Sequence, residues 1–238
     1  MDKHYIYIII LIIILIVICS CKINSSEKFK SKSQFKQDEW VIKHFNGKRD
    51  GVYLEIGTNN GEIDNNTTVL EKEYNWKGVC IDPLMYNVKN RSCKKFRVAL
   101  GSKPGITKYM TSVDNKHGLS GISEFVKSKY NNKVWADRLN EEGVTKEIDV
   151  EVRTPIDVLE ESKIPNVIDY MSLDVEGAEM NILKSFPFDK YCIRYSTIET
   201  NDDKNKETEL RNFMKSKGYK FVKHEGVDDV FSNDCKGF

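Results

Sequence analysis

Carboxylates follow two apolar segments in the second half of the chain, where they could accept a proton. VIDYMSLDVEGAE carries Asp174 and Glu176 directly after its apolar part, and IRYSTIET carries Glu199 near its end. Asp174 and Glu176 are two residues apart, so they lie on one side of an extended chain. His117, within KHGLSG, is a fourth candidate, in a loop that could close over a substrate. We expect these four residues to supply the proton acceptor that an alcohol nucleophile requires.

Each of these candidates also has a structural explanation. Asp174 or Glu176 could cap the helix that follows, Glu199 could be an exposed strand end, and His117 could be an ordinary loop histidine. The three acids could instead bind a magnesium ion that orients a hydroxyl group. The sequence does not demand such an ion, and we expect no metal.

A glycine turn in the first half of the chain indicates a cofactor site. YLEIGTNNGEID places Glu55 at the end of an apolar strand, with Gly57, Asn59 and Gly61 in the turn that follows. A strand, a glycine turn and a helix typically hold a nucleotide-like ligand beyond the carboxyl end of the strand. The dinucleotide pattern G-x-G-x-x-G is absent, which argues against NAD. The alternative is a tight turn without a ligand.

The charges around this turn indicate the kind of cofactor. Glu55, Glu62 and Asp64 lie in or next to the turn, and three carboxylates would repel the pyrophosphate of NAD. They would suit S-adenosylmethionine, which carries an ammonium and a sulfonium but no phosphate. Asp82 ends the next apolar strand, 21 residues after the last glycine of the turn. A carboxylate there can accept hydrogen bonds from ribose hydroxyls, although an ordinary turn before a proline is the alternative.

These residues must be positioned by strands that alternate with helices. The sequence predicts strands at 53–56, 78–81, 96–100, 106–112, 146–154, 167–174 and 193–200, and two short strands within 219–233. It predicts helices at 33–45, 65–74, 155–164, 177–186 and 206–218, and a charged segment of mixed character at 123–143. This alternation predicts an α/β protein with a mostly parallel sheet covered on both faces. We expect the last two strands to form a hairpin that adds an antiparallel edge strand.

Five segments in order resemble a known family. SQFKQDEW, YLEIGTNNGEIDNNT, KGVCIDP, TPIDVLEES and DYMSLDVEGAEMNILKSFPF together resemble the FkbM-type methyltransferases, over residues 33–232. The resemblance implies the Rossmann-like class I methyltransferase fold, with a mostly parallel seven-stranded sheet and an antiparallel C-terminal strand. It also implies S-adenosylmethionine as the cofactor, with Glu55, Gly57 and Gly61 lining its methionine part. Asp82 falls where the family carries its ribose acid, which is often Glu.

The resemblance extends to the segment before the first strand. Gln34, Gln37 and Asp38 match the upstream part of the family pattern, which implies that this segment folds over the cofactor. The alternative is a capped surface helix.

The N-terminus has a different composition from the rest of the chain. Residues 5–19 are apolar, and we expect 1–21 to form a transmembrane signal anchor, 22–33 a linker and 34–238 the FkbM-like domain. A cleaved signal peptide and a lipoprotein signal at Cys21 are the alternatives. Lysines after the apolar run favour a catalytic domain on the cytosolic side of the membrane.

Composition limits the partners of the protein. Its net charge is +1, so nothing in the bulk charge indicates nucleic acid. None of the six cysteines forms a CxxC pair, and we expect Cys80 and Cys192 to be buried free thiols rather than parts of a disulfide framework. The sequence does not predict an oligomeric state.

The function predicted from the sequence is methyl transfer from S-adenosylmethionine. The acceptor would be a hydroxyl on a sugar or glycan, a lipid-linked intermediate or a polyketide-like alcohol. A catalytically inactive cofactor-binding or scaffold protein of the same fold is the second hypothesis, because the proton acceptor is not fixed by the sequence. An NAD-dependent oxidoreductase is the third, and the glycine spacing disfavours it.

Overall fold

The computed structural model describes residues 30–62, 64–85, 88–112, 120–127, 129–130, 133–134 and 145–238. The folded unit begins at Ser31, close to the end of the expected linker. The expected membrane-spanning helix at 1–21 lies outside the described residues. Within the described ranges, no helix is long and apolar enough to cross a membrane.

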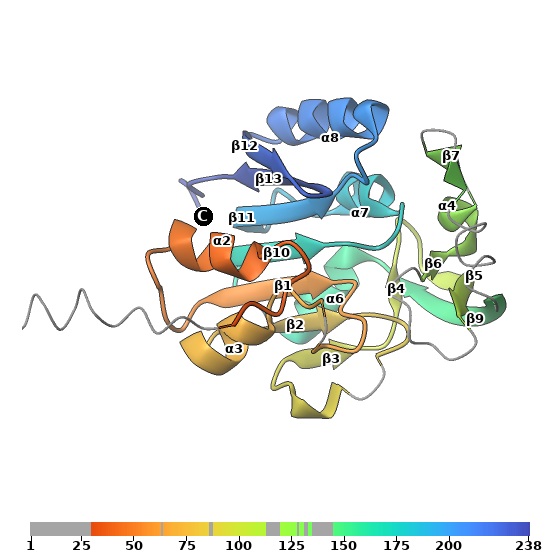
Figure 1. Ribbon diagram of the computed structural model, residues 1–238, viewed down its shortest axis with the longest axis horizontal. Coiled ribbons are helices and arrows are strands. Elements are labelled where there is room, and N and C mark those ends of the chain that lie inside the picture. Colours follow the sequence, from red (N-terminus) through yellow and green to blue (C-terminus); the bar gives the residue numbers. More distant parts are fainter. Residues whose placement is uncertain are drawn as a thin grey trace, which may run out of the picture. The chain divides into compact units, whose positions relative to one another are not determined.

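A seven-stranded sheet forms the centre of the fold (Figure 1). Its order is β12-β13-β11-β10-β1-β2-β3. Only β13 runs antiparallel to both of its neighbours, and the other strands share one direction. The strands are β1 (Val52–Ile56), β2 (Lys77–Ile81), β3 (Lys94–Phe96), β10 (Val167–Leu173), β11 (Cys192–Glu199), β12 (Lys220–Glu225) and β13 (Asp228–Ser232).

The sequence therefore correctly predicts a mostly parallel sheet with one antiparallel strand, but it places that strand wrongly. The C-terminal strand is antiparallel, as expected, but it lies between β11 and β12 and not at the edge. The hairpin thus inserts its second strand into the sheet. This position explains why β13 is buried over most of its length, whereas β12 is largely exposed.

Helices accompany the main sheet at the positions that the sequence indicates. They are α2 (Gln37–His44), α3 (Thr68–Tyr74), α6 (Pro155–Ser162), α7 (Glu179–Ser185) and α8 (Lys204–Ser216), with a single turn of 3-10 helix at Val88–Asn90. The largest cluster of buried side chains includes Leu54 and Ile56 from β1 and Ile182 and Leu183 from α7. Burial of such side chains stabilises the fold by about 25 cal/mol per Å² of apolar surface removed from water.

A second, four-stranded sheet was not expected. It has the order β4-β9-β5-β6 and stands to one side of the main sheet (Figure 1). Its strands are β4 (Ala99–Leu100), β5 (Gly105–Ser112), β6 (Gly121–Ile122) and β9 (Thr145–Arg153). The strand predicted at 96–100 is in fact two, because β3 ends at Phe96 in the main sheet and β4 pairs with β9 in the second.

The remaining described elements lie within 123–143, the segment of mixed character. They are the short helix α4 (Ser123–Val126) and a pair of two-residue strands, β7 (Lys129–Tyr130) and β8 (Lys133–Val134).

Two disulfides overturn the expectation of free thiols. Cys80 in β2 is bonded to Cys93, and Cys192 at the start of β11 is bonded to Cys235 near the C-terminus. Each bond joins a buried strand to a segment that is distant in sequence. Neither pair has the short spacing of a recognisable cysteine motif, so the sequence alone did not reveal them.

The strand register brings the candidate site residues to one edge of the main sheet. Ile56 in β1 pairs with Ile81 in β2 and with Leu173 in β10, and Leu173 pairs in turn with Ile198 in β11. The residues that follow these four positions are Gly57, Asp82, Asp174 and Glu199. Because these strands are parallel, the cofactor turn and three of the candidate acids share the carboxyl edge of the sheet.

Candidate active site

The glycine turn after β1 packs directly against the acid-bearing loop after β10. Gly57 has φ 93°, and a Cβ atom added there would lie 1.7 Å from the carbonyl oxygen of Asp174. Only glycine can occupy this position, because both the backbone conformation and the contact exclude a side chain. Asn59 and Gly61 are also left-handed, with φ 53° and 74°. The turn is thus a tight backbone loop whose start adjoins Asp174.

Asp82 links the glycine turn to the segment after β2. Its Oδ2 accepts a hydrogen bond from the backbone N–H of Asn59 at 2.9 Å. Its Oδ1 accepts hydrogen bonds from the N–H groups of Leu84 and Met85, at 2.7 and 3.3 Å. Burial raises the pKa of Asp82, and these three amide hydrogen bonds oppose that rise. Asp82 therefore lies beside the turn, as the sequence predicts, and also fixes the conformation of the turn.

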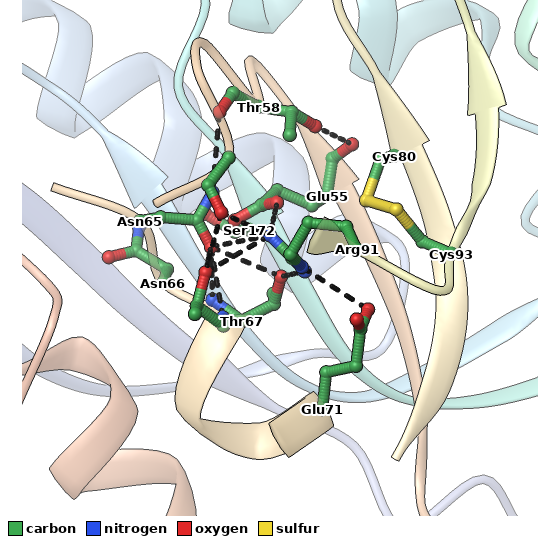
Figure 2. Close-up of polar contacts among 12 residues, drawn as sticks. Glu55, Thr58, Asn65, Asn66, Thr67, Glu71, Cys80, Arg91, Cys93 and Ser172 are labelled. Atoms are coloured by element: carbon green, nitrogen blue, oxygen red, sulfur yellow. Dashed lines mark hydrogen bonds and ion pairs between the residues drawn. A yellow bond between two sulfur atoms is a disulfide. The ribbon is translucent and has the colours of Figure 1, made fainter. Parts of the chain in front are cut away.

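Arg91 lies at the centre of a buried polar network beneath the turn (Figure 2). Its side chain is fully buried. Its guanidinium donates hydrogen bonds of 2.6–3.2 Å to the side chains of Tyr53, Asn65, Thr67, Thr68 and Glu71 and to the backbone oxygen of Gly61. It also lies 3.6 Å from Glu55 Oε2. A single cation therefore compensates two buried carboxylates and holds both ends of the glycine turn region.

The same network fixes the start of α3. Asn65 Oδ1 accepts hydrogen bonds from the backbone N–H groups of Thr67 and Thr68, at 3.1 and 2.9 Å. Asn65 thus holds the turn that leads into α3, which begins at Thr68, with Thr67 at the N-cap position, and not at 65. Asn65 also donates through Nδ2 to the backbone oxygen of Thr58, so this turn is joined to the glycine turn.

Arg91 changes the electrostatic argument that was made from the sequence. Glu55 is 2% exposed, and its charge is opposed by Arg91. Burial raises the pKa of Glu55 above its usual value, and the charge of Arg91 only partly opposes this rise. Glu62 is partly exposed, with Lys72 at 3.9 Å and a hydrogen bond from Asn90. The turn is therefore less negative than three uncompensated carboxylates would make it.

The segment before β1 contacts both the cofactor turn region and the far side of the sheet edge. Lys32 accepts a hydrogen bond at its backbone oxygen from the N–H of Asn65, at 3.0 Å. Asp38 is fully buried and accepts hydrogen bonds from Ser31 Oγ and the Lys32 N–H. Gln37 donates to Asp228 Oδ2 at 2.7 Å, whereas Gln34 is exposed. Asp38 thus holds this segment in shape, and Gln37 connects it to β13.

Asp174, Glu176 and Glu199 converge at the other half of the edge. Each offers one carboxylate oxygen, and the three atoms lie within 4.8 Å of one another. Glu176 and Glu199 are buried, and Asp174 is half-buried. Glu176 has φ 56°, so the loop turns sharply between Asp174 and α7. The structure therefore brings together three of the four predicted catalytic residues. His117 lies outside the described residues.

The crowding of these acids shifts their protonation. Burial and the charges of Asp228 and Glu179 raise the pKa of Asp174 to about 7. Burial and the charges of Asp174 and Glu176 raise the pKa of Glu199 well above its usual value. The three carboxyl groups therefore do not all carry a charge at neutral pH. A carboxyl group with a pKa near 7 is suited to proton transfer at that pH.

Two residues that support this cluster were not assigned from the sequence. Glu179 Oε1 accepts hydrogen bonds from the backbone N–H groups of Val175 and Gly177, at 3.2 and 3.0 Å. Glu179 therefore holds the loop between β10 and α7. The N-cap position of α7 is Ala178, so neither Asp174 nor Glu176 occupies the capping position that the sequence offered to them. Lys206, a buried residue of α8, lies 2.7 Å from Glu179 Oε2. A lysine at a buried helix position is a signal for a carboxylate partner.

Comparison with known proteins agrees with this arrangement. Residues 55–221 match the model of the methyltransferase FkbM domain. The chain belongs to the FkbM methyltransferase family. No curated protein matches the sequence.

The FkbM match includes the glycine turn, Asp82 and the three clustered acids. It begins after the segment that contains Gln34 and Asp38 and ends within β12. FkbM methyltransferases typically use S-adenosylmethionine. Arg91 and all of its partners except Tyr53 also lie within the matched range. A lone arginine between two polar residues gave no pattern by which to find it in the sequence.

Proposed function

We propose that the protein transfers the methyl group of S-adenosylmethionine to a hydroxyl oxygen. The observation that carries this proposal is the contact between Gly57 and the carbonyl oxygen of Asp174. It makes the cofactor turn and the acid cluster neighbours on one edge of the sheet. A ligand bound at the turn would therefore lie beside groups that can accept a proton.

The residues at the turn are compatible with this cofactor. A carboxylate offers about four lone-pair positions, and Asp82 uses three of them for backbone amides. One position remains for a ribose hydroxyl. The spacing of Gly57 and Gly61 does not match the dinucleotide pattern, which disfavours NAD. We therefore assign the ribose to Asp82 and the methionine part to the turn from Gly57 to Gly61.

The chain's own residues would position the acceptor and take its proton. S-adenosylmethionine, when bound, supplies a methyl group on a positively charged sulfur. The residues from Gly57 to Gly61 and Asp82 would hold this donor, which would give up its methyl carbon to the acceptor oxygen and leave with the electron pair of the broken carbon–sulfur bond. The hydroxyl proton passes to a carboxylate of the cluster, for which Asp174 is suited by its pKa of about 7.

The acceptor class follows from chemistry and location. A sugar or glycan, a lipid-linked intermediate or a polyketide-like alcohol would each offer the required hydroxyl. An inactive scaffold of the same fold is the alternative, but it gives no reason to gather three acids whose charges repel one another.

The two disulfides support a location that differs from the lysine-based expectation. Disulfides persist in oxidising compartments and are rare in the cytosol. We infer a domain anchored through residues 1–21 and exposed to an oxidising compartment. Alkylation of protein from its native host should label Cys80, Cys93, Cys192 and Cys235 only after reduction. Full labelling without a reductant would place the domain in the cytosol.

Calorimetry with the full chain tests the cofactor assignment. S-adenosylmethionine and its demethylated product should bind, and NAD should not. Asp82→Ala should weaken binding by about 1–3 kcal/mol through the lost hydrogen bonds. Asp189→Ala, at an exposed acid on the α7–β11 connection, is the matched control and should bind normally. Binding of NAD alone, or equal affinities of the Asp82 and Asp189 variants, would contradict the assignment.

A further inference from the structure

We propose that Asn90 is the attachment site of an N-linked glycan. The acceptor pattern for this modification is Asn-x-Ser/Thr, in which x is not proline. The sequence contains the pattern four times, beginning at Asn24, Asn65, Asn66 and Asn90. Asn24 lies outside the described residues, and the other three lie within the domain. The proposed methyl transfer makes no use of Asn90.

Exposure separates the three patterns within the domain. Asn65 is 2% exposed and Asn66 is 8% exposed, whereas Asn90 is an exposed residue. Asn90 is the last residue of the 3-10 turn Val88–Asn90, and Ser92, the hydroxyl residue of its pattern, is exposed as well. A glycan is bulky and hydrophilic, so it needs a side chain at the surface. Of the three asparagines, Asn90 alone meets this requirement in the folded protein.

The hydrogen bond of the Asn90 side chain is compatible with a glycan. Its Nδ2 donates to Glu62 Oε1 at 2.9 Å, at the surface of the protein. An amide nitrogen has two hydrogens, and the sugar replaces one of them. The other can still donate to Glu62, so the modified Asn90 can keep its contact with the residue that follows the glycine turn.

The same modification would disrupt the fold at the two buried patterns. Asn65 Nδ2 donates to the backbone oxygen of Thr58 at 3.3 Å, and its Oδ1 accepts a hydrogen bond from Arg91 at 3.0 Å (Figure 2). Asn66 Nδ2 donates to Ser172 Oγ at 2.9 Å. A sugar on either nitrogen would have to fit into a close-packed interior. We therefore expect Asn65 and Asn66 to be unmodified in the folded protein.

The glycan rests on the oxidising location inferred from the disulfides and not on methyl transfer. N-linked glycans occur on surface loops of secreted proteins, and disulfides persist in the same class of protein. The two features also occur on one connection here, because Cys93, shortly after Asn90 in the sequence, is bonded to Cys80.

The modification is a substitution at the first carbon of the sugar. The donor would be an oligosaccharide carried on a lipid diphosphate, and a transferase of the host would catalyse the step. Asn90 Nδ2 forms a bond to the anomeric carbon and gives up one proton. The bond from that carbon to the diphosphate oxygen breaks, and the lipid diphosphate leaves with the electron pair.

The fold requires this step to precede closure of the connection after β2. Arg91, the middle residue of the pattern, is fully buried in the polar network. The Ser92 N–H donates to Glu71 Oε1 at 2.6 Å, and the disulfide at Cys93 follows. A transferase that must bind the backbone around Asn90 therefore acts on the chain before it folds. After folding, the exposed position of Asn90 leaves room for the glycan.

Site-resolved mass spectrometry of the full chain, purified from its native host, tests the site. Peptide N-glycosidase in heavy-oxygen water releases the glycan and leaves a mass-labelled aspartate at the attachment position. We expect this label at Asn90 and not at Asn65 or Asn66. Ser92→Ala removes the pattern but keeps the asparagine and the backbone N–H at position 92, and it should abolish the label at Asn90. Ser92→Thr keeps a valid pattern and should keep the label.

Three results would overturn the proposal. They are an unlabelled Asn90, a label at Asn90 that survives Ser92→Ala, and a label at Asn65 or Asn66 in the folded protein. An unlabelled Asn90 in protein with an intact Cys80–Cys93 bond would reject the glycan alone, and free thiols in the same protein would also reject the oxidising location. Calorimetry with S-adenosylmethionine on the same preparation records a failure of the methyl donor separately.

Discussion

The carboxyl edge of the main sheet has two halves, one after β1 and β2 and the other after β10 and β11, and both contain buried carboxylates. In the first half, Arg91 lies within 3.6 Å of both Glu55 and Glu71 and hydrogen-bonds the turn between them. In the second half, Asp174, Glu176 and Glu199 face one another, and the nearby Lys206 pairs with Glu179. In the first half an arginine thus separates the acids, whereas in the second half three acids lie against one another.

This difference between the two halves indicates different roles, one in folding and the other in binding and catalysis. A compensated, hydrogen-bonded network fixes a backbone shape, which is what a cofactor turn requires. Acids that lie against one another cost stability and are retained where a site must move a proton. We therefore expect substitutions in the first half to affect folding and those in the second half to affect binding and catalysis.

The largest effect should follow the loss of Arg91. Arg91→Met keeps the apolar stem but leaves Glu55 and Glu71 buried without a cation. Removal of one partner of a buried ion pair typically costs about 3–5 kcal/mol. Urea denaturation should show this loss of unfolding free energy. Arg97→Met, at an exposed position between β3 and β4, should change stability by less than about 0.5 kcal/mol.

A double variant sharpens this test. If Glu55 is the charge that Arg91 compensates, Glu55→Gln in the Arg91→Met background should recover part of the lost stability, because a neutral group is cheaper to bury. No recovery would mean that the stabilising contribution of Arg91 comes from its contacts with the glycine turn and with the residues at the start of α3.

Removal of the disulfides should have the next largest effect, and the two bonds should differ in what they affect. Cys80 and Cys93 are 13 residues apart, and Cys192 and Cys235 are 43 apart. Loop closure predicts losses of about 3 and roughly 4 kcal/mol on conversion of each pair to alanine. Cys93 lies two residues after Arg91, so only loss of Cys80–Cys93 should also weaken binding of S-adenosylmethionine. Equal effects of both pairs on cofactor affinity would remove the link between this disulfide and the turn.

The sequence was sufficient for the main sheet and for the ends of its strands. Apolar runs and the turns after them predicted β1, β2, β10 and β11, and the parallel arrangement then placed Gly57, Asp82, Asp174 and Glu199 together. These features are local, so a reading along the chain can find them.

The features that the sequence did not reveal are those that depend on distant partners. β4 is two residues long and pairs with β9, about fifty residues later, so the second sheet leaves no local pattern at 99–100. Arg91 and Cys93 acquire their roles only when the connection after β2 folds under the turn. A free cysteine and a disulfide-bonded cysteine can have the same apolar neighbours in sequence. They differ only in whether a second cysteine lies close by in the folded chain.

The pH dependence of stability provides a smaller test of the first half. Burial alone would raise the pKa of Glu71, but hydrogen bonds from Tyr53 and Ser92 and the charge of Arg91 outweigh burial and lower it. A carboxyl group with a lowered pKa in the folded state stabilises the fold above its unfolded pKa of about 4.3, and this contribution is lost as the pH falls through the folded value. Glu71→Gln should therefore flatten the acid limb of the stability curve by about 1 kcal/mol. Glu73→Gln, exposed on the same helix, should leave that limb unchanged.

The smallest effect on the unfolding free energy should come from a substitution in the second half of the edge, after β10 and β11. The sign of this effect is more informative than its size. Glu199→Gln removes an acid whose ionisation is opposed by burial and by the charges of Asp174 and Glu176. We expect the unfolding free energy to stay within about 0.5 kcal/mol of the parent value or to rise, in contrast to the loss predicted for Arg91→Met. Urea denaturation of both variants under the same conditions provides the comparison. A loss of 2 kcal/mol or more, on the scale of a broken buried pair, would show that Glu199 has a stabilising partner and that the two halves of the edge are built alike.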